Sequence, residues 1–560
     1  MSIVNSLFGS GYAGLGSGFR LRLLTTGCPF SPHRLPANRQ LPIACPARCV
    51  MLFPPALMSH PSSLPRICIA LGFSDSQKLL EHARREINGG ECFFEFRLDY
   101  LTAPEQGVAA IRRFLAAHPD CWILATCRRH QNHGKFNGSV EDQIRILDGA
   151  LEAGARAVDI EIESAENALP RLEALRGKGL LLLSYHNYDG TPSPETVLRR
   201  LSRISADGYK IVTTARKPSD NSRILALTKT HARTPLIVLA MGETGFPTRV
   251  LATAWGGMFT YAAPNSAEGT ASGQVSARVL RHLYRAEKFT RSAKIYGVIA
   301  DPVRHSISPA VHNRAFQAQR LDAVYLPFLV QPAQLKDFFI LAESLPVAGF
   351  SVTIPHKQKI IRYLDVVDPL ARRIGAVNTV WKKAGKWRGA NTDADAVTVP
   401  LSRKLRLSKA SVLVVGNGGA ARSAAYGLVS SGAKVSIVGR NPDRVRSLAR
   451  ACGAESLLRD QLNGRKFDAL IHATPLGMFP HPEGCFFPDA IPAELVFDMV
   501  YNPLETTLLR HAAAQGSAVI PGLQMFLEQA GKQFEIWTGA SSPRSVMEKA
   551  AIEALSPACS

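Results

Sequence analysis

The stretch Ser411-Val-Leu-Val-Val-Gly-Asn-Gly-Gly-Ala-Ala-Arg422 decides one fold of this chain. Its first five residues are typical of a buried parallel strand, and the glycines open an alanine-rich stretch typical of a helix. A second strand-like run follows at residues 434–438. Strand, glycine turn, helix and strand in this order predict a Rossmann-type domain that binds a dinucleotide pyrophosphate at the helix start. The predicted cofactor contacts in the turn are Gly416, Gly418, Gly419 and Ala420.

The residues after the second strand predict which dinucleotide binds. An enzyme that uses NAD usually carries an acidic residue there for the ribose hydroxyl. This chain instead has Gly439-Arg-Asn-Pro-Asp-Arg444. Arg440 and Arg444 suit a 2′-phosphate through charge-assisted hydrogen bonds, which predicts NADP. The alternative is a solvated arginine pair on a surface loop.

Upstream, four motifs each place a polar side chain after a predicted strand or turn. They are His305-Ser-Ile-Ser-Pro309, Ser351-Val-Thr-Ile-Pro-His-Lys357, Ile374-Gly-Ala-Val-Asn-Thr379 and Gly389-Ala-Asn-Thr-Asp393. Any one of them could be a helix cap. A strand-like run at residues 295–300 precedes the first.

Together the four motifs resemble the ordered signature of shikimate dehydrogenases, over residues 294–556. The resemblance implies that Lys357 and Asp393 form the pair that transfers a proton while hydride reaches the carbonyl carbon. It also implies substrate contacts from Ser306, Ser308, Thr353, Asn378, Tyr501, Gln529 and Gln533. With His472-Ala-Thr-Pro-Leu-Gly-Met478 and Pro521-Gly-Leu-Gln-Met525, it implies nicotinamide contacts from Thr474, Met478 and Gly522.

The chain before residue 294 alternates short apolar runs with longer helical stretches. Eight such runs in about 200 residues predict a closed (β/α)₈ barrel. Together with the Rossmann-type domain, this barrel makes the predicted fold class of the chain α/β. The runs cover residues 66–72, 93–99, 122–128, 157–162, 181–186, 209–214, 235–241 and 258–262.

Polar residues gather in these runs, mostly toward the carboxyl ends where barrels carry their active sites. They are Glu95, Arg97, Arg128, His186 and Lys210, with Arg249 in the following loop. A lysine nucleophile must be neutral, which requires burial or cationic neighbours that lower its pKa. Arginines on the same rim would supply those neighbours and hold a carboxylate, and a histidine could move a proton. The set indicates Schiff-base chemistry on an anionic carbonyl compound.

Five motifs in these runs resemble those of type I 3-dehydroquinate dehydratases, over residues 66–285. They are Glu95-Phe-Arg-Leu-Asp99, Thr126-Cys-Arg128, Ser184-Tyr-His186, Tyr209-Lys-Ile211 and Met241-Gly-Glu-Thr-Gly-Phe-Pro-Thr-Arg249, followed by the loop Thr270-Ala-Ser-Gly-Gln274. The resemblance implies Lys210 as the imine-forming nucleophile and His186 as the general acid and base. It implies substrate binding by Arg249, Thr270 and Gln274, with Glu95, Arg97 and Arg128 completing the pocket.

One position departs from that family. Asn132 stands where the family usually has a glutamate that orients the histidine. An amide can hydrogen-bond His186 but cannot stabilise an imidazolium, so slower turnover or a shifted pH profile is expected.

The two resemblances, in this order, are those of bifunctional 3-dehydroquinate dehydratase/shikimate dehydrogenases of the shikimate pathway. The first product would be the second substrate. Two alternatives stay open: a second half that oxidises quinate, and a catalytically weak barrel that acts as a structural module. The expected domains are 1–63, a basic leader; 64–287, the barrel; 293–395 with helices at 523–556, the shikimate-binding domain; and 396–522, the NADP domain.

The first 74 residues contain no Asp or Glu and show no sustained period. This composition is typical of a transit peptide, and equally of an upstream stretch translated from a wrong start with Met58 as the true one. The expected location is therefore the cytoplasm, or the plastid if the leader is a transit peptide. Scattered cysteines predict reduced thiols and no metal site. The net charge is +21, but the sequence shows none of the motifs of nucleic-acid binding, so no nucleic-acid partner is expected. No apolar run is long enough to span a membrane.

Overall fold

The computed structural model describes residues 64–265, 267 and 269–556. The expected leader and the start at Met58 lie outside the described residues. Among the residues that the structure describes, no helix is long and apolar enough to cross a bilayer.

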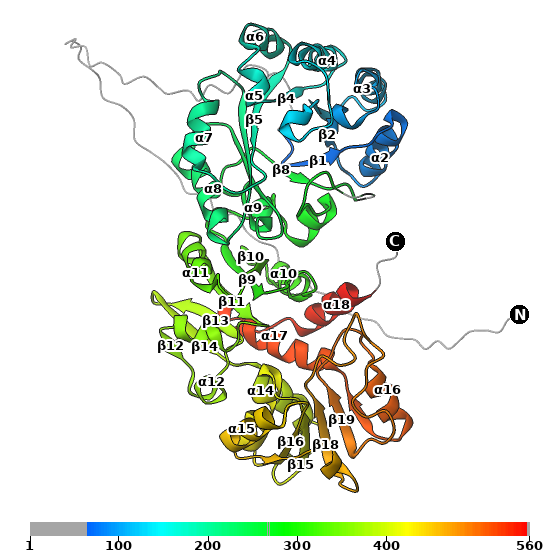
Figure 1. The fold of residues 1–560 in the computed structure, drawn as a ribbon, viewed down its shortest axis with the longest axis vertical. Coiled ribbons are helices and arrows are strands. Elements are labelled where there is room, and N and C mark those ends of the chain that lie inside the picture. Colours follow the sequence, from blue (N-terminus) through cyan, green and yellow to red (C-terminus); the bar gives the residue numbers. More distant parts are fainter. Residues whose placement is uncertain (1–63, 266, 268, 557–560) are drawn as a thin grey trace, which may run out of the picture. The chain divides into compact units, whose positions relative to one another are not determined.

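The first eight strands form one parallel sheet that curls into a nearly closed barrel (Figure 1). Their order is β7-β6-β5-β4-β3-β2-β1-β8, and Met258 N donates to Leu236 O across the gap between β7 and β8. The predicted α/β barrel is therefore confirmed. The strands are Ile67–Leu71 (β1), Phe93–Arg97 (β2), Trp122–Thr126 (β3), Ala157–Glu161 (β4), Leu180–His186 (β5), Gly208–Thr214 (β6), Leu236–Met241 (β7) and Thr260–Ala262 (β8).

Helices surround these strands in Figure 1, and local sequence explains where several of them begin. Asp75 caps α2, Ser139 and Asp142 form a capping box at α4, and Ser193 caps α7 ahead of a proline at its first position. Each such cap contributes about 1 kcal/mol. The helices are Ser76–Asn88 (α2), Gln106–Ala117 (α3), Val140–Glu152 (α4), Ile162–Ala165 (α5), Leu169–Lys178 (α6), Pro194–Leu201 (α7), Ser219–Thr230 (α8) and Phe246–Leu251 (α9).

A second, six-stranded sheet follows in the order β10-β9-β11-β13-β14-β12. Strands β9, β10 and β11 are parallel, and β13 runs antiparallel to β11 and β14. The loops after β9 and β11 carry the Ser-Ile-Ser and Thr-Ile-Pro-His-Lys motifs, so both motifs leave the same edge of the sheet. The strands are Lys294–Ala300 (β9), Ala323–Leu329 (β10), Val347–Val352 (β11), Val366–Val367 (β12), Thr379–Lys383 (β13) and Lys386–Ala390 (β14).

The third sheet is entirely parallel, with the order β17-β16-β15-β18-β19-β20. This is the strand order of a doubly wound dinucleotide-binding domain, with the first strand, β15, at its centre. The strands are Ser411–Val415 (β15), Lys434–Val438 (β16), Glu455–Ser456 (β17), Phe467–His472 (β18), Ala493–Asp498 (β19) and Ala518–Ile520 (β20).

The last two helices return to the second sheet. Phe526 and Phe534 of α17 and Met547 of α18 share one buried core with Tyr296 of β9 and Val311 of α10. The helices of this half are Ser308–Ala318 (α10), Leu335–Ser344 (α11), Pro369–Ile374 (α12), Asp393–Ser402 (α13), Gly419–Ser430 (α14), Pro442–Cys452 (α15), Thr507–Ala514 (α16), Gly522–Thr538 (α17) and Arg544–Leu555 (α18).

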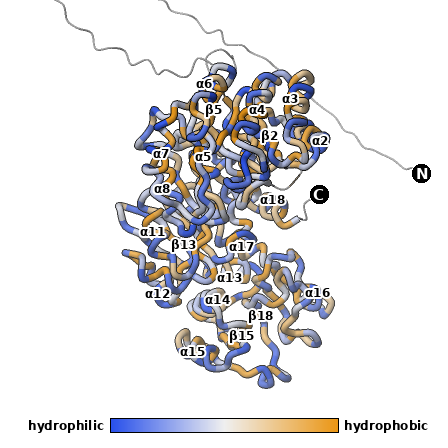
Figure 2. Tube along the Cα trace, turned by 45° about the horizontal axis from the view of Figure 1, so that its top comes forward, coloured by the Kyte–Doolittle hydropathy of each residue, from blue (hydrophilic) through white to orange (hydrophobic). Residues whose placement is uncertain are grey.

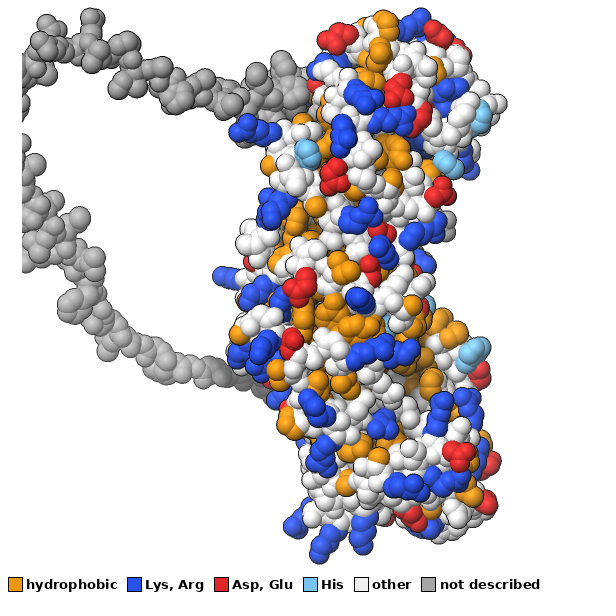
Figure 3. Space-filling model, turned by 60° about the vertical axis from the view of Figure 1, so that its left-hand side comes forward, with side chains coloured by type: hydrophobic (Ala, Val, Ile, Leu, Met, Phe, Trp, Pro, Cys, Tyr) orange, Lys and Arg blue, Asp and Glu red, His pale blue; other side chains and the backbone are white. Residues whose placement is uncertain are grey.

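Hydrophobic residues concentrate in the strands, as the tube around β5 and β15 in Figure 2 shows. The run Leu180–Leu183 of β5 and the run Val412–Val415 of β15 are fully buried, which parallel strands covered on both faces require. On the face drawn in Figure 3, lysine and arginine side chains are scattered among acidic and uncharged ones and form no continuous stripe.

Candidate active sites

Lys210 lies inside the barrel at the middle of β6, and only 4% of its surface is exposed. Its Nζ donates to Asp159 Oδ2 and to the Tyr261 hydroxyl, both at 2.9 Å, and lies 3.4 Å from Glu95 Oε1. The nearest charged neighbours of the amine are thus carboxylates, whereas the sequence predicted arginines. A carboxylate at this distance can accept the proton that the amine must lose before it attacks a carbonyl.

His186 ends β5, one strand away from Lys210. Burial, followed by the charges of Arg128, Lys210 and Arg97, holds the pKa of His186 well below its ordinary value. No described residue gives His186 a carboxylate partner. The imidazole is therefore neutral at neutral pH and can accept a proton from a substrate carbon.

Two arginines at this end of the barrel are buried with free donor groups. Arg128 lies 3.6 Å from Asp159, and its Nε and Nη2 have no hydrogen-bond partner among the described residues. Arg249, 2% exposed, donates from Nη2 to Ser272 O, and burial lowers its pKa to about 10. The buried guanidinium of Arg249 has no carboxylate partner among the described residues, which is costly, so an anionic ligand fits here.

The contact between Arg249 and Ser272 brings the loop after β8 to the same place. Thr270 and Gln274 lie in this loop, and Gln274 Oε1 accepts from Ala271 N. Two further predicted pocket residues have protein partners: Glu95 Oε1 accepts from Thr126 Oγ1, and Arg97 makes two hydrogen bonds to Asp99. Lys210 and Glu95 thus lie within their strands, and Arg249 lies beside the loop that carries Thr270 and Gln274.

Asn132 does not contact His186. Its Nδ2 donates to Glu161 Oε1 at 3.2 Å, and Glu161 also accepts from Arg129 N, Gln143 and Ser164. The structure therefore does not show the expected hydrogen bond between Asn132 and His186, because the Asn132 amide donates to Glu161 at the end of β4 instead.

Replacing Asn132 with glutamate tests this contact. The new carboxylate would face Glu161, so we expect a loss of about 1 kcal/mol of stability. On acidification the dehydratase should lose activity as His186 becomes protonated, at a pH below the ordinary range of a histidine because the pKa of His186 is lowered. We expect this acidic limb of the pH profile to be the same in Asn132→Glu and in the wild type. Asn132→Gln is the neutral control. A limb that moves to higher pH in Asn132→Glu alone would show that the side chain reaches His186.

In the second half, Lys357 and Asp393 form an ion pair of 2.6 Å between Nζ and Oδ2. Asn378 Nδ2 donates to the other carboxylate oxygen, Oδ1, at 2.7 Å. Asp393 is buried, whereas 17% of the Lys357 side chain is exposed. The lysine amine is thus the more exposed member of the pair and the one that a substrate could meet.

A chain of buried hydrogen bonds extends behind this pair. Tyr325 donates to Ser351, Ser351 donates to Gln533 Oε1, and Gln533 Nε2 donates to Asn378 O and Thr379 Oγ1. Gln533 is only 1% exposed and both of its Nε2 hydrogens have partners. In this structure it supports Asn378 from behind.

The other predicted substrate residues lie on four segments. Ser306 Oγ accepts from Ser308 N, and Thr353 directly follows β11. Tyr501, whose pKa is raised by burial, packs its ring on Phe526 of α17, one turn before Gln529.

The glycine turn after β15 lies beside Lys357. A Cβ added to Gly419, the first residue of α14, would lie 3.5 Å from Lys357 Cδ. Gly416 has a φ of +125°, and a Cβ there would lie 2.8 Å from Ala473 O, so only glycine fits. Gly418 and Ala420 flank Gly419, and α14 has neither a side-chain cap nor an acidic residue in its first turn. Its free N–H groups fit a pyrophosphate.

Three further residues are predicted to contact the cofactor. Thr474 Cγ2 would lie 3.3 Å from a Cβ at Gly416, and Met478, in the same loop, is 46% exposed. Gly522 opens α17 so close to Val500 O that a Cβ would lie 2.3 Å from it.

Arg440 and Arg444 are exposed at the carboxyl end of β16. Neither side chain has an ion-pair partner among the described residues, whereas the nearby Arg446 is paired with Asp443. Two free guanidiniums beside the glycine turn fit the 2′-phosphate of NADP.

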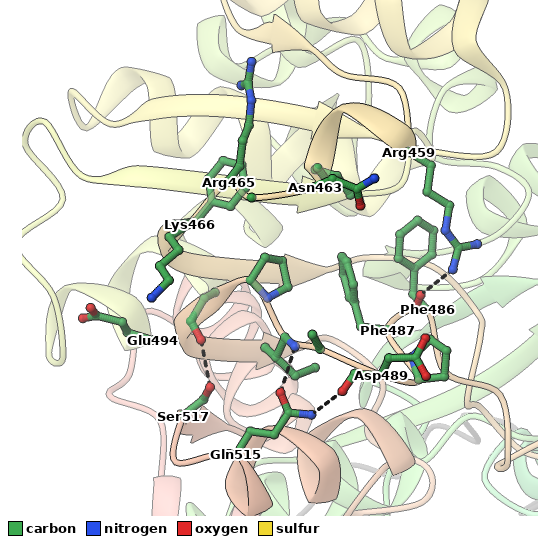
Figure 4. Close-up of a pocket in the computed structure, with 18 of the residues that line it drawn as sticks. Arg459, Asn463, Arg465, Lys466, Phe486, Phe487, Asp489, Glu494, Gln515 and Ser517 are labelled. Carbon is green, nitrogen blue, oxygen red and sulfur yellow. Dashed lines mark hydrogen bonds between the residues drawn. The ribbon is translucent and has the colours of Figure 1, made fainter.

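A further cavity lies elsewhere. It measures about 890 Å³ and opens at the amino ends of β18, β19 and β20, next to Phe467, Ala493 and Ser517. Figure 4 shows Arg459 bonded to the Phe486 carbonyl, and Gln515 bonded to Asp489 and the Ile491 backbone. Ligands of open parallel sheets bind at the carboxyl ends of the strands, so this cavity is not the cofactor site.

Comparison with known proteins adds to this geometry. Residues 67–290 match the family model of type I 3-dehydroquinase. Residues 298–380 match the shikimate dehydrogenase substrate-binding domain, 401–475 match shikimate/quinate 5-dehydrogenase, and 522–552 match the shikimate 5′-dehydrogenase C-terminal domain. The bifunctional 3-dehydroquinate dehydratase/shikimate dehydrogenase, chloroplastic, of Arabidopsis thaliana is 37% identical over 86% of this chain and 83% of its own length.

The chain belongs to this bifunctional family. A shikimate dehydrogenase (NADP⁺) of Methanosarcina acetivorans is 39% identical over 47% of this chain and 99% of its own length. A crystal structure of shikimate 5-dehydrogenase from Thermus thermophilus with NADP(H) and shikimate is 34% identical, with a TM-score of 0.44 over 47% of this chain and 99% of that one. The predicted family and fold are confirmed.

Some residues of both sites were not predicted. In the barrel, Asp159 and Tyr261 accept hydrogen bonds from Lys210. In the second half, Tyr325 and Ser351 support Gln533. Asp159 carries a usable signal, because a carboxylate inside the apolar run of β4 is rarely buried unless it is paired. Tyrosine and serine in strands carry no such signal, since they are ordinary residues of a β-sheet.

Proposed function

We propose that the barrel converts 3-dehydroquinate to 3-dehydroshikimate through an imine on Lys210. The amine, after losing a proton to Asp159, attacks the carbonyl carbon, and loss of water gives an iminium. Its positive charge acidifies the neighbouring C–H and His186 accepts that proton. The protonated imidazole then donates a proton to the substrate hydroxyl, which leaves as water. Hydrolysis of the imine then returns the amine. The observation that carries this proposal is the buried amine with two carboxylates and a neutral histidine nearby.

The binding roles follow from the free donors at the barrel end. Arg249, with Thr270 and Gln274 from the neighbouring loop, holds the substrate carboxylate and hydroxyls. Arg128, which lies 3.6 Å from Asp159, offers Nε and Nη2, neither of which has a hydrogen-bond partner among the described residues. No metal is needed, because the iminium already acts as the electron sink.

We further propose that the second half reduces 3-dehydroshikimate to shikimate. NADPH, when bound, supplies the hydride. Lys357 delivers the proton to the developing alkoxide and Asp393 keeps the amine charged and oriented, while Asn378 fixes the carboxylate. Ser306, Ser308, Thr353, Tyr501 and Gln529 bind the substrate, and Gln533 supports Asn378. Gly416, Gly418, Gly419, Ala420, Thr474, Met478 and Gly522 contact the cofactor.

Separate assays of the two half-reactions test these proposals. 3-Dehydroquinate alone should give 3-dehydroshikimate, and shikimate with NADP⁺ should give NADPH. Quinate in place of shikimate tests the open alternative. If the dehydrogenase oxidises quinate at least as well as shikimate, quinate replaces shikimate as its assigned substrate. If the barrel is inactive, the barrel is a structural module.

Cofactor choice is tested by Arg440→Ala. A charge-assisted hydrogen bond contributes about 1.5–3 kcal/mol, so kcat/KM with NADPH should fall by roughly 10- to 100-fold. The value with NADH, which lacks the 2′-phosphate, should barely change. Arg444→Ala should have a smaller effect, because Arg444 lies within α15. Arg446→Ala is the matched control, since Arg446 is already paired with Asp443. A wild-type preference for NADH, or equal losses with both cofactors, would refute the assignment.

The location of the protein stays a proposal. We propose the cytoplasm, with the plastid as the alternative that a chloroplastic relative favours. Expressing a fluorescent protein behind residues 1–63 in plant cells decides between them: plastid import supports the alternative, and diffuse fluorescence supports the cytoplasm.

A further inference from the structure

Three side chains stand in a row at the carboxyl edge of the NADP-domain sheet. Asp498 Oδ1 lies 2.8 Å from His472 Nδ1, and Thr474 Oγ1 lies 2.6 Å from His472 Nε2. His472 ends β18 and Asp498 ends the neighbouring strand β19, where the two residues are directly paired in register. His472 is 1% exposed and Asp498 is fully buried.

The carboxylate determines the direction of these hydrogen bonds. Asp498 also accepts from Val500 N at 3.0 Å and from Thr506 Oγ1 at 2.6 Å. An ionised carboxylate can only accept, so the proton lies on His472 Nδ1. In the neutral imidazole Nε2 is then an acceptor, and the Thr474 hydroxyl donates to it. The Thr474 oxygen accepts from Leu476 N and keeps one acceptor position free.

Thr474 lies beside the glycine turn after β15. It is partly exposed, and its Cγ2 lies 3.3 Å from where a Cβ of Gly416 would be. Gly416 begins the turn that precedes α14. Thr474 therefore borders the turn whose residue Gly419 lies beside Lys357.

We propose that His472 and Asp498 are positioning residues that hold the Thr474 hydroxyl as an acceptor for a donor group of bound NADP(H). The donors on that cofactor half are the nicotinamide carboxamide N–H and the ribose hydroxyls. The inference rests on the proposed dehydrogenase function.

An Asp-His-Thr row also occurs in hydrolases, but there free N–H groups stabilise the oxyanion. Here the nearby N–H of Leu476 is donated to Thr474 itself.

Removing the hydroxyl without changing its shape tests the contact. In Thr474→Val we expect the KM for NADPH to rise roughly 3- to 10-fold, the value of one net hydrogen bond, with a smaller change in kcat. Thr474→Ser keeps the hydroxyl and should restore a KM near that of the wild type. An unchanged KM in Thr474→Val would overturn the proposal.

A double-mutant cycle tests whether His472 acts through Thr474. In His472→Asn the shorter amide can still bond Asp498 but no longer reaches Thr474, so the KM should rise as in Thr474→Val. The double variant should then show no further rise. Additive effects would overturn the positioning role, and His472→Gln serves if the asparagine variant does not fold.

The outcomes separate this inference from the function on which it rests. A wild-type chain that never oxidises NADPH with 3-dehydroshikimate would refute the dehydrogenase proposal itself. An active wild type with an unaffected Thr474→Val variant would refute the Thr474 contact alone.

Discussion

Lys210→Ala is expected to lose dehydration of 3-dehydroquinate almost completely, by on the order of 10⁴- to 10⁶-fold, as when other covalent nucleophiles are removed. Without the amine no iminium forms, and the C–H next to the carbonyl is not acidified enough for elimination. Shikimate oxidation should be unaffected, because Lys357 and Asp393 lie on other elements. The rate of product formation, measured separately for each half-reaction, checks both expectations.

The substitution also leaves two buried carboxylates unpaired, since Lys210 contacts Asp159 and Glu95. Breaking a buried pair can cost about 3–5 kcal/mol, so the fold of the variant must be monitored by its unfolding curve. Lys210→Met fills more of the same space and serves as a second variant. Lys229→Ala, an exposed lysine on α8, is the control. Borohydride added with 3-dehydroquinate should reduce the imine and fix a mass increase on Lys210, and the same mass on another lysine would contradict the assignment.

Lys357→Ala and Asp393→Asn are expected to slow the reduction of 3-dehydroshikimate by on the order of 10²- to 10⁴-fold each. Lys357 loses the proton donor, and Asp393→Asn removes the charge that pairs with the amine at 2.6 Å while keeping an oxygen near Asn378. The combined variant should be little slower than the worse single one, because the two groups act as a unit. Lys359→Ala, exposed two residues on, is the control.

Near-normal rates in both single variants would place the proton relay elsewhere. A rise in KM for 3-dehydroshikimate with kcat unchanged would instead make Lys357 a binding residue, because uniform binding affects KM alone. Dehydratase activity of the same samples shows whether the loss is specific.

Much of the fold could be predicted, because strand–helix alternation and the glycine turn are local patterns. The run at residues 209–214 became β6, and the turn at Gly416 has the positive φ that its glycine suggested. The carboxyl ends of parallel strands meet at one edge, which is why the polar residues there were expected to gather.

Contacts between distant segments could not be predicted in the same way. Charge alone suggested arginines beside Lys210, yet Asp159 and Glu95 are its nearest charged neighbours, because β2, β4 and β6 all point side chains into the barrel. Asn132 was aligned to a histidine partner, but Glu161 lies within its reach. The pairing of His472 with Asp498 depends on the register of β18 and β19, which the sequence does not reveal.

The most direct test of the account uses one mixture. When the Lys210→Ala variant is the only enzyme given 3-dehydroquinate and NADPH, it should consume neither compound. When the Lys357→Ala variant is the only enzyme, it should accumulate 3-dehydroshikimate without oxidising NADPH. The two variants mixed should form shikimate and oxidise one NADPH for each, as the wild type does, because each supplies the site that the other lacks. A mixture that forms no shikimate while the wild type does, or a Lys210→Ala variant that still forms it alone, would contradict two separate sites with Lys210 as the nucleophile of the first.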